Sequence, residues 1–207
     1  MSSEAGNMSA DRRERLVRTA AEHFASVGYE QASLNRIIRD CGLSKSSFYH
    51  FIRSKQELFD LVIRDLGQAL VAEVRIPLPQ DFAGGAFWTQ AERLVDRLTA
   101  ASALEVGFTQ LGRMFYLSGA PADAESALSE ASEAIEGWLH EVLAVGRRSG
   151  TVRDDLPISL QSQLVLAVLR ALDEWTLRHG GDLCREDLRD LVATEYQCIR
   201  RLLDPSG

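Results

Sequence analysis

The 207-residue sequence contains little lysine and little cysteine. Of its 23 basic residues only two are lysines, Lys45 and Lys55. The three cysteines, Cys41, Cys184 and Cys198, are odd in number and form no C-x-x-C motif. This pattern argues against a disulfide framework and against a cysteine-rich zinc site, and it fits a reducing compartment. We therefore expect a cytoplasmic protein.

Long apolar runs are also missing. No window reaches the roughly 18 consecutive apolar residues of a transmembrane helix, so we expect no membrane partner. Charged residues at 11–15 stand where a secretory signal would need an apolar core. The net charge of −7, from 23 basic and 30 acidic residues, taken alone argues against a nucleic-acid coat protein. Residues 1–60 differ, because they hold nine basic and eight acidic side chains.

Alternating β-branched runs are absent, and apolar residues recur at three- and four-residue spacing along most of the chain. This periodicity predicts an all-α fold of about nine helices. Gly28 is expected in the left-handed conformation after the first helix, and the Pro- and Gly-containing stretch 76–85 is expected to be a linker or long loop. The expected helices cover about 11–27, 33–41, 45–52, 55–74, 86–104, 106–117, 121–150, 158–179 and 185–203.

Serines precede three of the N-terminal helices. Ser33, Ser44 and Ser54 each stand where an N-cap is expected, and Glu57 follows Ser54 at the spacing of a capping box. Pro121 fits the first turn of the seventh helix.

The segment 33–57 predicts a helix, a tight glycine turn and a second short helix, which is the layout of a helix-turn-helix. If Phe48 points inward, Phe51 and Ile52 also point inward and two polar rows point outward. None of the outward residues is acidic, and all can donate or accept hydrogen bonds to phosphates or base edges. They are Lys45 with Tyr49 and Ser46 with His50, with Ser47 at the edge.

The stretch SLNRIIRDCGLSKSSFYHFIRSKQEL (33–58) resembles the signature of the TetR family of bacterial transcriptional regulators. Phe24, Gly28 and Tyr29 fit the same pattern, as do the helix count and the loop TVRDDLP (151–157). The resemblance implies an N-terminal three-helix DNA-binding domain, 11–57, and a helical effector-binding and dimerisation domain, 58–207. A tail, 1–10, is expected to be disordered. Two residues depart from the family pattern, since bulky Ile38 replaces a common small residue and Ile52 replaces the usual Phe.

The resemblance also implies roles for matched positions. Ser33 would cap the second helix and reach a phosphate, Tyr49 would contact the DNA backbone, and Lys55 would bind a phosphate at the start of the fourth helix. The complete set of expected DNA contacts is Ser33, Lys45, Ser46, Ser47, Tyr49, His50 and Lys55. Alternatives remain: Tyr49 could support the small domain, and His50 could simply be solvated.

Members of the family commonly hold an effector among helices four to eight. Large and polar-tipped residues gather there, and each is also a reasonable core residue. Arg113 could meet an anionic ligand or pair with Glu105 or Asp173. The expected effector contacts are Trp88, Phe108, Gln110, Arg113, Met114, Phe115, Trp138 and Trp175.

The last two helices are expected to form the homodimer interface, because a small helix-turn-helix binds tightly only when two copies are coupled by symmetry. The run 164–172 is apolar on more than one helical face, which fits an interface between subunits. Burial of this helix inside one subunit would also explain the apolar faces. The expected interface residues are Leu164, Val168, Leu172, Leu188, Leu191, Tyr196 and Ile199.

Signs of an enzyme are absent. His140 and Glu141 begin an H-E pair, but Ala144 stands where an H-E-x-x-H zinc site needs its second histidine. There is no G-x-S-x-G elbow and no phosphate-binding glycine loop. We expect no catalytic residue, metal or cofactor. The function expected is a repressor released from a palindromic operator by a small-molecule effector. An activator, an effector-independent regulator, a helical enzyme and a protein-binding scaffold are the alternatives.

Overall fold

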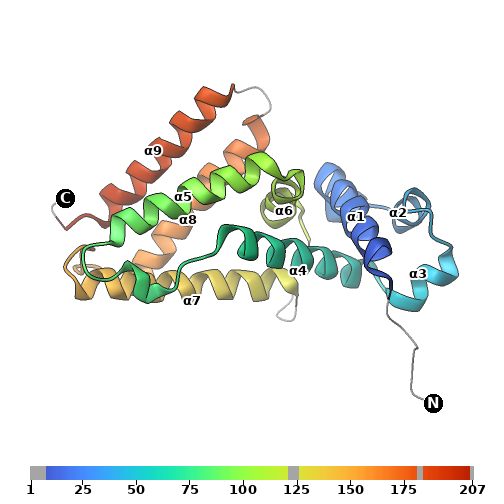
Figure 1. Cartoon of the computed structure of the whole chain (residues 1–207), viewed down its shortest axis with the longest axis horizontal. Helices are drawn as coiled ribbons and strands as arrows, with labels where there is room; N and C mark the ends of the chain where they lie inside the picture. The colour runs from blue at the N-terminus through green and yellow to red at the C-terminus, as the bar shows by residue number, and fades with distance from the viewer. Residues whose placement is uncertain (1–7, 121–125, 181–183, 206–207) are drawn as a thin grey trace, which may run out of the picture. The chain divides into compact units, whose positions relative to one another are not determined.

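The computed structural model describes residues 8–120, 126–180 and 184–205, and within them the chain forms nine α-helices, one short 3-10 helix and no strand (Figure 1). The predicted all-α fold is confirmed. The helices are α1 (Ala10–Gln31), α2 (Leu34–Asp40), α3 (Lys45–Phe51), α4 (Lys55–Val74), η1 (Pro79–Phe82), α5 (Phe87–Leu104), α6 (Val106–Leu117), α7 (Ala127–Arg148), α8 (Ile158–His179) and α9 (Arg185–Leu203).

The predicted bounds of α6, α8 and α9 agree with the structure at both ends. The predicted first turn of the seventh helix at Pro121 and most of the predicted tail, residues 1–7, lie outside the described residues. Among the helices that are described, none is both long enough and apolar enough to cross a membrane.

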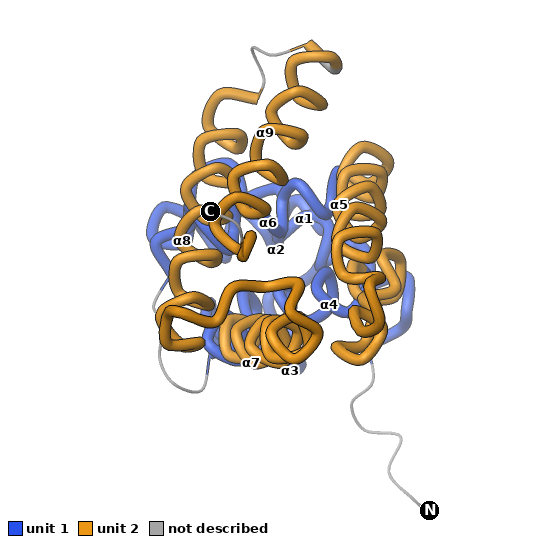
Figure 2. The backbone as a smooth tube through the Cα atoms, turned by 90° about the vertical axis from the view of Figure 1, so that its left-hand side faces the viewer, with its two compact units in different colours: residues 1–69, 106–130 blue, residues 70–105, 131–207 orange. Residues whose placement is uncertain are grey.

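The chain divides into two compact units, of which the first comprises residues 1–69 and 106–130 and the second residues 70–105 and 131–207 (Figure 2). The first unit is larger than the predicted DNA-binding domain 11–57, because α6 packs along α1. A helix that the sequence assigns to the body is therefore part of the same compact unit as the helix-turn-helix.

Helix α1 continues past its predicted end at Val27 and is kinked at Gly28, where φ is 78° and ψ is 171°. The backbone N–H of Tyr29 donates to the carbonyl oxygen of Ser118, 2.9 Å away, just beyond the end of α6. A Cβ atom on residue 28 would lie 3.1 Å from the same oxygen. Glycine is thus required at this position both by its positive φ and by the close approach of the α6 end.

The core of the first unit includes most of the apolar face of α1. Leu16, Ala20 and Phe24 are buried, but Val27, at the kink, is 46% exposed. An aromatic cluster forms where Phe24 and Tyr29 meet Phe59 of α4, with ring centroids 5.0 and 5.3 Å from that of Phe59. Val27 is exposed although it continues the three- and four-residue spacing, because it lies next to the kink at Gly28.

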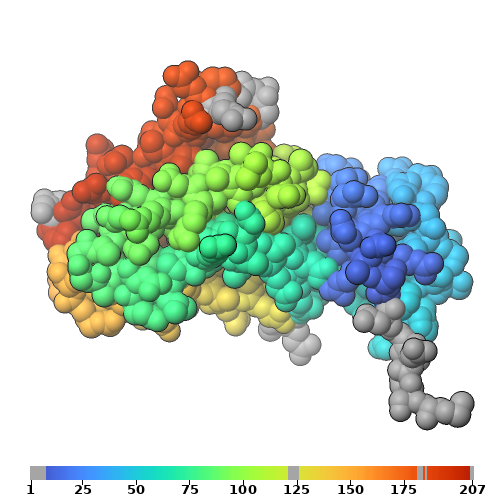
Figure 3. Space-filling model, in the orientation of Figure 1, coloured from blue at the N-terminus to red at the C-terminus, as the bar shows by residue number. Residues whose placement is uncertain are grey.

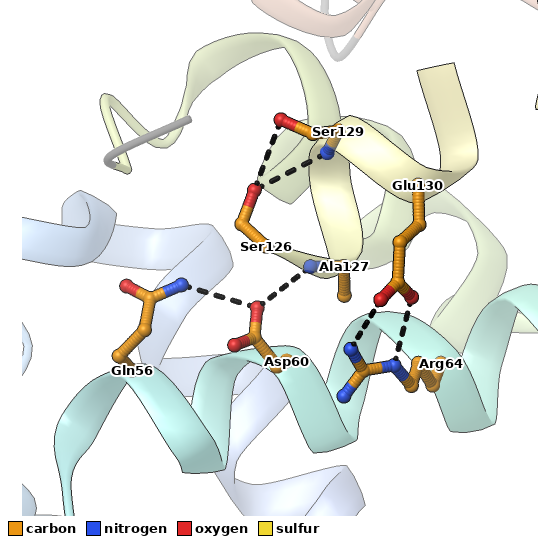
Figure 4. A network of polar contacts seen from close by, with 7 residues as sticks. All are labelled: Gln56, Asp60, Arg64, Ser126, Ala127, Ser129 and Glu130. Atoms are coloured by element: carbon orange, nitrogen blue, oxygen red, sulfur yellow. Dashed lines mark hydrogen bonds and ion pairs between the residues drawn. The ribbon is translucent and has the colours of Figure 1, made fainter. Parts of the chain in front are cut away.

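Polar contacts join α4 to the first turn of α7 within the same unit (Figure 4). The Asp60 carboxylate accepts the backbone N–H of Ala127 at 3.0 Å, and Arg64 forms a two-pronged contact with Glu130. Ser126 accepts the backbone N–H of Ser129 at 3.2 Å, as an N-cap does. The beginning of α7 is therefore fixed to the middle of α4.

The second unit has its own core. Phe82, Phe87 and Leu143 are buried there together with Val152 of the loop that follows α7. The predicted linker 76–85 contains η1, because burial of Phe82 anchors the segment. Helix α5 buries only Phe87 and Ala101 fully, and it lies at the surface on the face that Figure 3 shows.

Candidate DNA-binding site

The helix-turn-helix is formed by α2, a turn at Gly42 with φ of 67°, and α3. The hydroxyl of Ser44 accepts the backbone N–H of Ser47 at 3.1 Å, which caps α3 as predicted. Phe48 is fully buried, as predicted from its place in the pattern. Phe51, predicted to point inward, is half-buried.

The two isoleucines that depart from the family pattern are both core residues. Ile38 and Ile52 are buried. Ile52 also receives the end of α3, because its backbone N–H donates to the carbonyl oxygen of Phe48 at 3.0 Å. The departures therefore change which residues fill the small core, and they leave the outer face of α3 to polar side chains.

The outer face of α3 carries the predicted contact residues. Tyr49 is 48% exposed and rests edge-on against Phe48, with ring centroids 5.2 Å apart. The His50 ring packs in the same way against Phe51 at 4.9 Å. These contacts orient two exposed rings on one helix. The exposed residues of the predicted set are Ser33, Lys45, Ser46, Ser47, Tyr49 and His50.

Ser33 precedes α2 as predicted, but its side chain makes no capping hydrogen bond. Its backbone carbonyl accepts the N–H groups of Arg36 and Ile37, both at 3.0 Å. The predicted side-chain cap is therefore wrong. By contrast, Ser54 caps α4 by accepting the N–H of Glu57 at 3.0 Å.

The Glu57 carboxylate does not close the predicted capping box onto the Ser54 backbone. It accepts the backbone N–H of Arg53 instead, at 2.6 Å. The reciprocal bond is therefore displaced by one residue, and it ties the link between α3 and α4 to the first turn of α4.

Lys55 has surroundings that differ from those of the outer face. Its ammonium donates to the backbone carbonyl oxygens of Tyr29 at 2.8 Å and Glu30 at 3.1 Å, and it lies 4.5 Å from the centroid of the Tyr29 ring. The side chain is half-buried. No sequence pattern pointed to this contact, since Tyr29 and Lys55 belong to different helices.

A hydrogen bond joins α1 to α2. Nε2 of His23 lies 2.9 Å from Oδ2 of Asp40, and Nε of Arg39 donates to the other carboxylate oxygen at 3.0 Å. The hydrogen bond from Arg39, followed by that from His23, holds the pKa of Asp40 below its usual range. This bond fixes the end of α2 close to the turn that precedes α3.

The predicted effector residues of α6 all belong to the first unit. Met114 is fully buried, and Nε of Arg113 donates to the backbone carbonyl of Ala25 in α1 at 3.2 Å. Phe115 packs edge-on against Tyr116, while Phe108 and Gln110 are half-buried. Arg113 therefore contributes to the packing of α6 on α1.

The predicted effector residues of the second unit have separate surroundings. Trp88 packs edge-on against Phe87 at 5.0 Å and Tyr196 at 6.1 Å. Trp138 donates its indole N–H to the carbonyl oxygen of Pro77 at 2.9 Å. Trp175 is 44% exposed and stacks on His179.

Helices α8 and α9 pack against each other within the chain. Of the predicted interface residues, Leu164 is exposed, whereas Val168, Leu172, Leu188, Leu191, Tyr196 and Ile199 are half-buried. The hydroxyl of Tyr196 donates to the Glu92 carboxylate at 3.0 Å, and burial followed by this bond raises the pKa of Tyr196 to about 12. Ile199 packs on the core of the second unit.

An exposed apolar stripe runs along α8 at spacings of three and four residues. Its members were not predicted as a set, although their spacing was visible in the sequence. They are Leu160, Leu164, Ala167, Ala171 and Trp175. In the described residues, no three His, Cys, Asp or Glu side chains gather as a metal site would need.

Residues 16–62 match the family model described as bacterial regulatory proteins, tetR family. A tetR-family transcription regulator from Shewanella sp. PV-4 superimposes with a TM-score of 0.70 at 20% identity, covering 93% of this chain and 98% of that one. No curated protein matches the sequence.

Two further solved structures have the same fold. The fatty acid degradation regulator FadR from Bacillus halodurans has a TM-score of 0.70 at 18% identity, over 90% of this chain and 97% of that one. NalD, the secondary repressor of the MexAB-OprM multidrug efflux pump in Pseudomonas aeruginosa, has a TM-score of 0.65 at 17% identity, over 95% and 98%.

A helix-turn-helix with an exposed polar face on its second helix is the arrangement with which proteins of this class enter the DNA major groove. The N-terminal segment therefore resembles the tetR family, and the chain shares the fold of solved structures that carry that family's name.

Proposed function

We propose that the chain is a homodimeric repressor, which binds a near-palindromic operator in the bacterial cytoplasm and is released from it by a small-molecule effector. The observation that carries the DNA-binding part is the outer face of α3. Lys45, Tyr49 and His50 are exposed there around the buried anchor Phe48. A face of this kind can enter the major groove without displacing any core residue.

The proposed contacts divide by chemistry. Lys45 and Tyr49 bind phosphates, which supply affinity without sequence preference. His50 and Ser46 lie on the other outward row and read base edges. Ser33 contributes a phosphate contact through a hydroxyl that makes no capping bond. Ser47, exposed at the edge of the face, completes the proposed contacts of α3.

The proposed dimer joins two copies through α8 and α9. The exposed stripe that includes Leu160, Leu164 and Trp175 supplies an apolar surface of a kind that an isolated chain rarely exposes. Ala167 and Ala171 lie within it and would let a second helix approach closely. The half-buried members of the predicted interface set then stabilise this surface by packing α9 against α8.

The proposed effector acts on α6, where Phe108, Arg113 and Phe115 combine apolar surface with one guanidinium. Because α6 packs along α1, a ligand that moves α6 would bias the position of the DNA-binding helices. Two of the similar structures are a fatty acid degradation regulator and an efflux-pump repressor. Both names are compatible with control by small molecules.

The proposal is tested by selecting DNA duplexes from a random pool with the purified protein and then footprinting the selected duplexes. We expect a near-palindromic site whose half-sites lie about 34–36 Å apart or at a multiple of that spacing. Binding should weaken steeply with salt. Failure to prefer any selected duplex over random DNA would overturn the proposal. A small molecule that releases the protein from the duplex would identify the effector. If the small molecules that act only strengthen binding to the duplex, release by an effector is contradicted.

A further inference from the structure

Three arginines gather where α5 meets the end of α4, in the second unit. Nε of Arg97 donates to the carbonyl oxygen of Arg93 at 3.2 Å, and its Nη1 donates to that of Arg75 at 3.0 Å. Arg75 and Arg93 are exposed, and within the described part of the chain none of the three forms an ion pair. Their guanidinium groups therefore remain available to carboxylates from another molecule.

Arg75 has a backbone conformation that is unusual for a residue with a side chain. It follows the last residue of α4 with a φ of 51°, in the left-handed region where a helix usually ends on glycine. No other residue of the described chain, apart from glycines, has a positive φ. Because strain of this kind persists mostly at functional surfaces, the arginine at this position indicates a use for its side chain.

Two exposed apolar side chains lie beside the arginines. Val71, one turn before Arg75 on α4, is 57% exposed, and Leu78, three residues after it, is 58% exposed. Helix α5 and the end of α4 lie on the face of the molecule that Figure 3 shows. We call this group, formed by Val71, Arg75, Leu78, Arg93 and Arg97, the arginine patch.

The outer side of α7 has the complementary character, and we call it the α7 face. Glu133, Gly137 and Glu141 follow one another at four-residue spacing and are exposed, with exposed Glu136 and His140 beside them. In the described residues the three glutamates form no ion pair. A Cβ atom at Gly137 would meet nothing within 4 Å. A glycine inside a helix costs stability, and here it leaves a hollow among carboxylates.

The arginine patch and the α7 face are neighbours in the second unit. The indole N–H of Trp138, on α7, donates to the carbonyl oxygen of Pro77 at 2.9 Å. Trp138 follows Gly137, and Pro77 lies between Arg75 and Leu78. One chain thus carries both halves of an electrostatic match next to each other. A second copy, rotated by half a turn, can place its α7 face on the patch and receive the first copy's α7 face on its own patch.

We propose that the arginine patch binds the α7 face of a second copy of this chain, in a two-fold contact separate from the proposed α8 and α9 interface. The arginines pair with the glutamates, and Leu78 fits against Gly137. Because exposed ion pairs contribute little individually, the association is weak and depends on salt. This contact goes beyond the proposed function, since it needs neither an operator nor an effector.

Sedimentation velocity of the full chain without DNA measures the association at about 50 mM and about 500 mM NaCl. We expect a larger mass-average molar mass at the lower salt concentration. A chain with a net charge of −7 repels its own copies, so association that strengthens as salt falls requires a local attraction. A molar mass that does not rise as salt is lowered overturns the proposal.

Charge reversal tests the two faces separately and together. Arg93→Glu and Glu141→Arg should each weaken the low-salt association about tenfold, since an attraction becomes a repulsion. The chain with both substitutions should regain the association, because opposite charges again face each other and charges at low salt interact over about 10 Å. Arg18→Glu and Glu22→Arg make the same changes at exposed positions of α1 and should have no effect. A loss that the double variant does not regain overturns the pairing.

The hollow at Gly137 gives a test that does not depend on charge. Gly137→Leu fills it and should abolish the low-salt association. The melting temperature should not fall, because nothing lies within 4 Å of the new Cβ atom. Association equal to that of the wild type would overturn the fit of Leu78 against Gly137.

Two other outcomes are separable from this one. Arginines also bind phosphates, so binding of each variant to a random duplex is measured across the same salt range. If Arg93→Glu lowers the salt slope of DNA binding and leaves self-association unchanged, the patch is a DNA contact and the proposal is overturned. The species present at high salt reports on α8 and α9 alone. A monomer there refutes the proposed dimer, and a rise in mass at low salt still supports the arginine patch.

Discussion

Two glycines of α7 offer a matched pair of substitutions on one helix. A Cβ atom at Gly146 would lie 2.5 Å from Cγ2 of Val152 and 2.7 Å from Cε2 of Phe87. At Gly137, nothing lies within 4 Å of the same position. Both residues are helical, so any effect of alanine on the backbone is shared by the two sites.

The expected magnitudes follow from this difference. Alanine stabilises the interior of a helix by about 1 kcal/mol relative to glycine, and Gly137→Ala should show that gain. At Gly146 the methyl group must displace Val152 or Phe87, both of which are buried. Such overpacking costs about 1–3 kcal/mol. Gly146→Ala should therefore lower the free energy of unfolding by about 1 kcal/mol, which places the two variants about 2 kcal/mol apart.

Urea unfolding followed by circular dichroism measures both variants at one fixed protein concentration, because association with a second copy would contribute to stability. Equal m-values would allow the midpoints to be compared directly. The reasoning is refuted if Gly146→Ala is as stable as Gly137→Ala, since the core around Val152 would then have room for a methyl group.

Three further predictions concern charge and recognition. Burial, and next the nearby Asp173, raise the pKa of Glu195 to about 7. Glu195 therefore holds its proton more tightly in the folded state than in the unfolded state. The free energy of unfolding falls as Glu195 ionises, between about pH 5 and pH 7. Glu195→Gln should add about 2 kcal/mol at pH 8, after allowance for partial exposure, and less than about 1 kcal/mol at pH 5, by urea unfolding. Asp60→Ala removes the acceptor for the N–H of Ala127 and should lower the free energy of unfolding by about 1 kcal/mol in the same assay. An unchanged free energy of unfolding would contradict a stabilising role for this bond. His50→Ala should change the bases chosen in a duplex selection, and an identical selected site would exclude base reading by His50.

Helix positions were predictable from the sequence because spacing and caps act locally. Ser44 and Ser54 cap α3 and α4 through bonds to residues three positions ahead. Such bonds depend on adjacent sequence alone. For the same reason, the residues on the exposed face of α3 could be predicted once Phe48 was taken as the inward-facing residue.

Features that depend on distant segments were not predictable in this way. Val27 is exposed because Gly28 breaks the helical face, and the break is fixed by Ser118, far along the chain. The inclusion of α6 in the first unit has the same origin. Tyr196 likewise matched an interface stripe by its spacing, but its hydroxyl contacts Glu92 of α5.

The two lysines show where sequence reasoning reaches its limit. Both fall in the segment that resembles the TetR signature, and a count of charges treats them alike. The fold separates them, because Lys45 is exposed on α3, whereas Lys55 begins a helix that contacts α1 beside its kink. An exposed ammonium gains most from a phosphate, but one already held by two carbonyls and an aromatic face must give up those contacts first. The salt dependence of random-DNA binding by the variants Lys45→Met and Lys55→Met therefore measures which of the two lysines contacts phosphates.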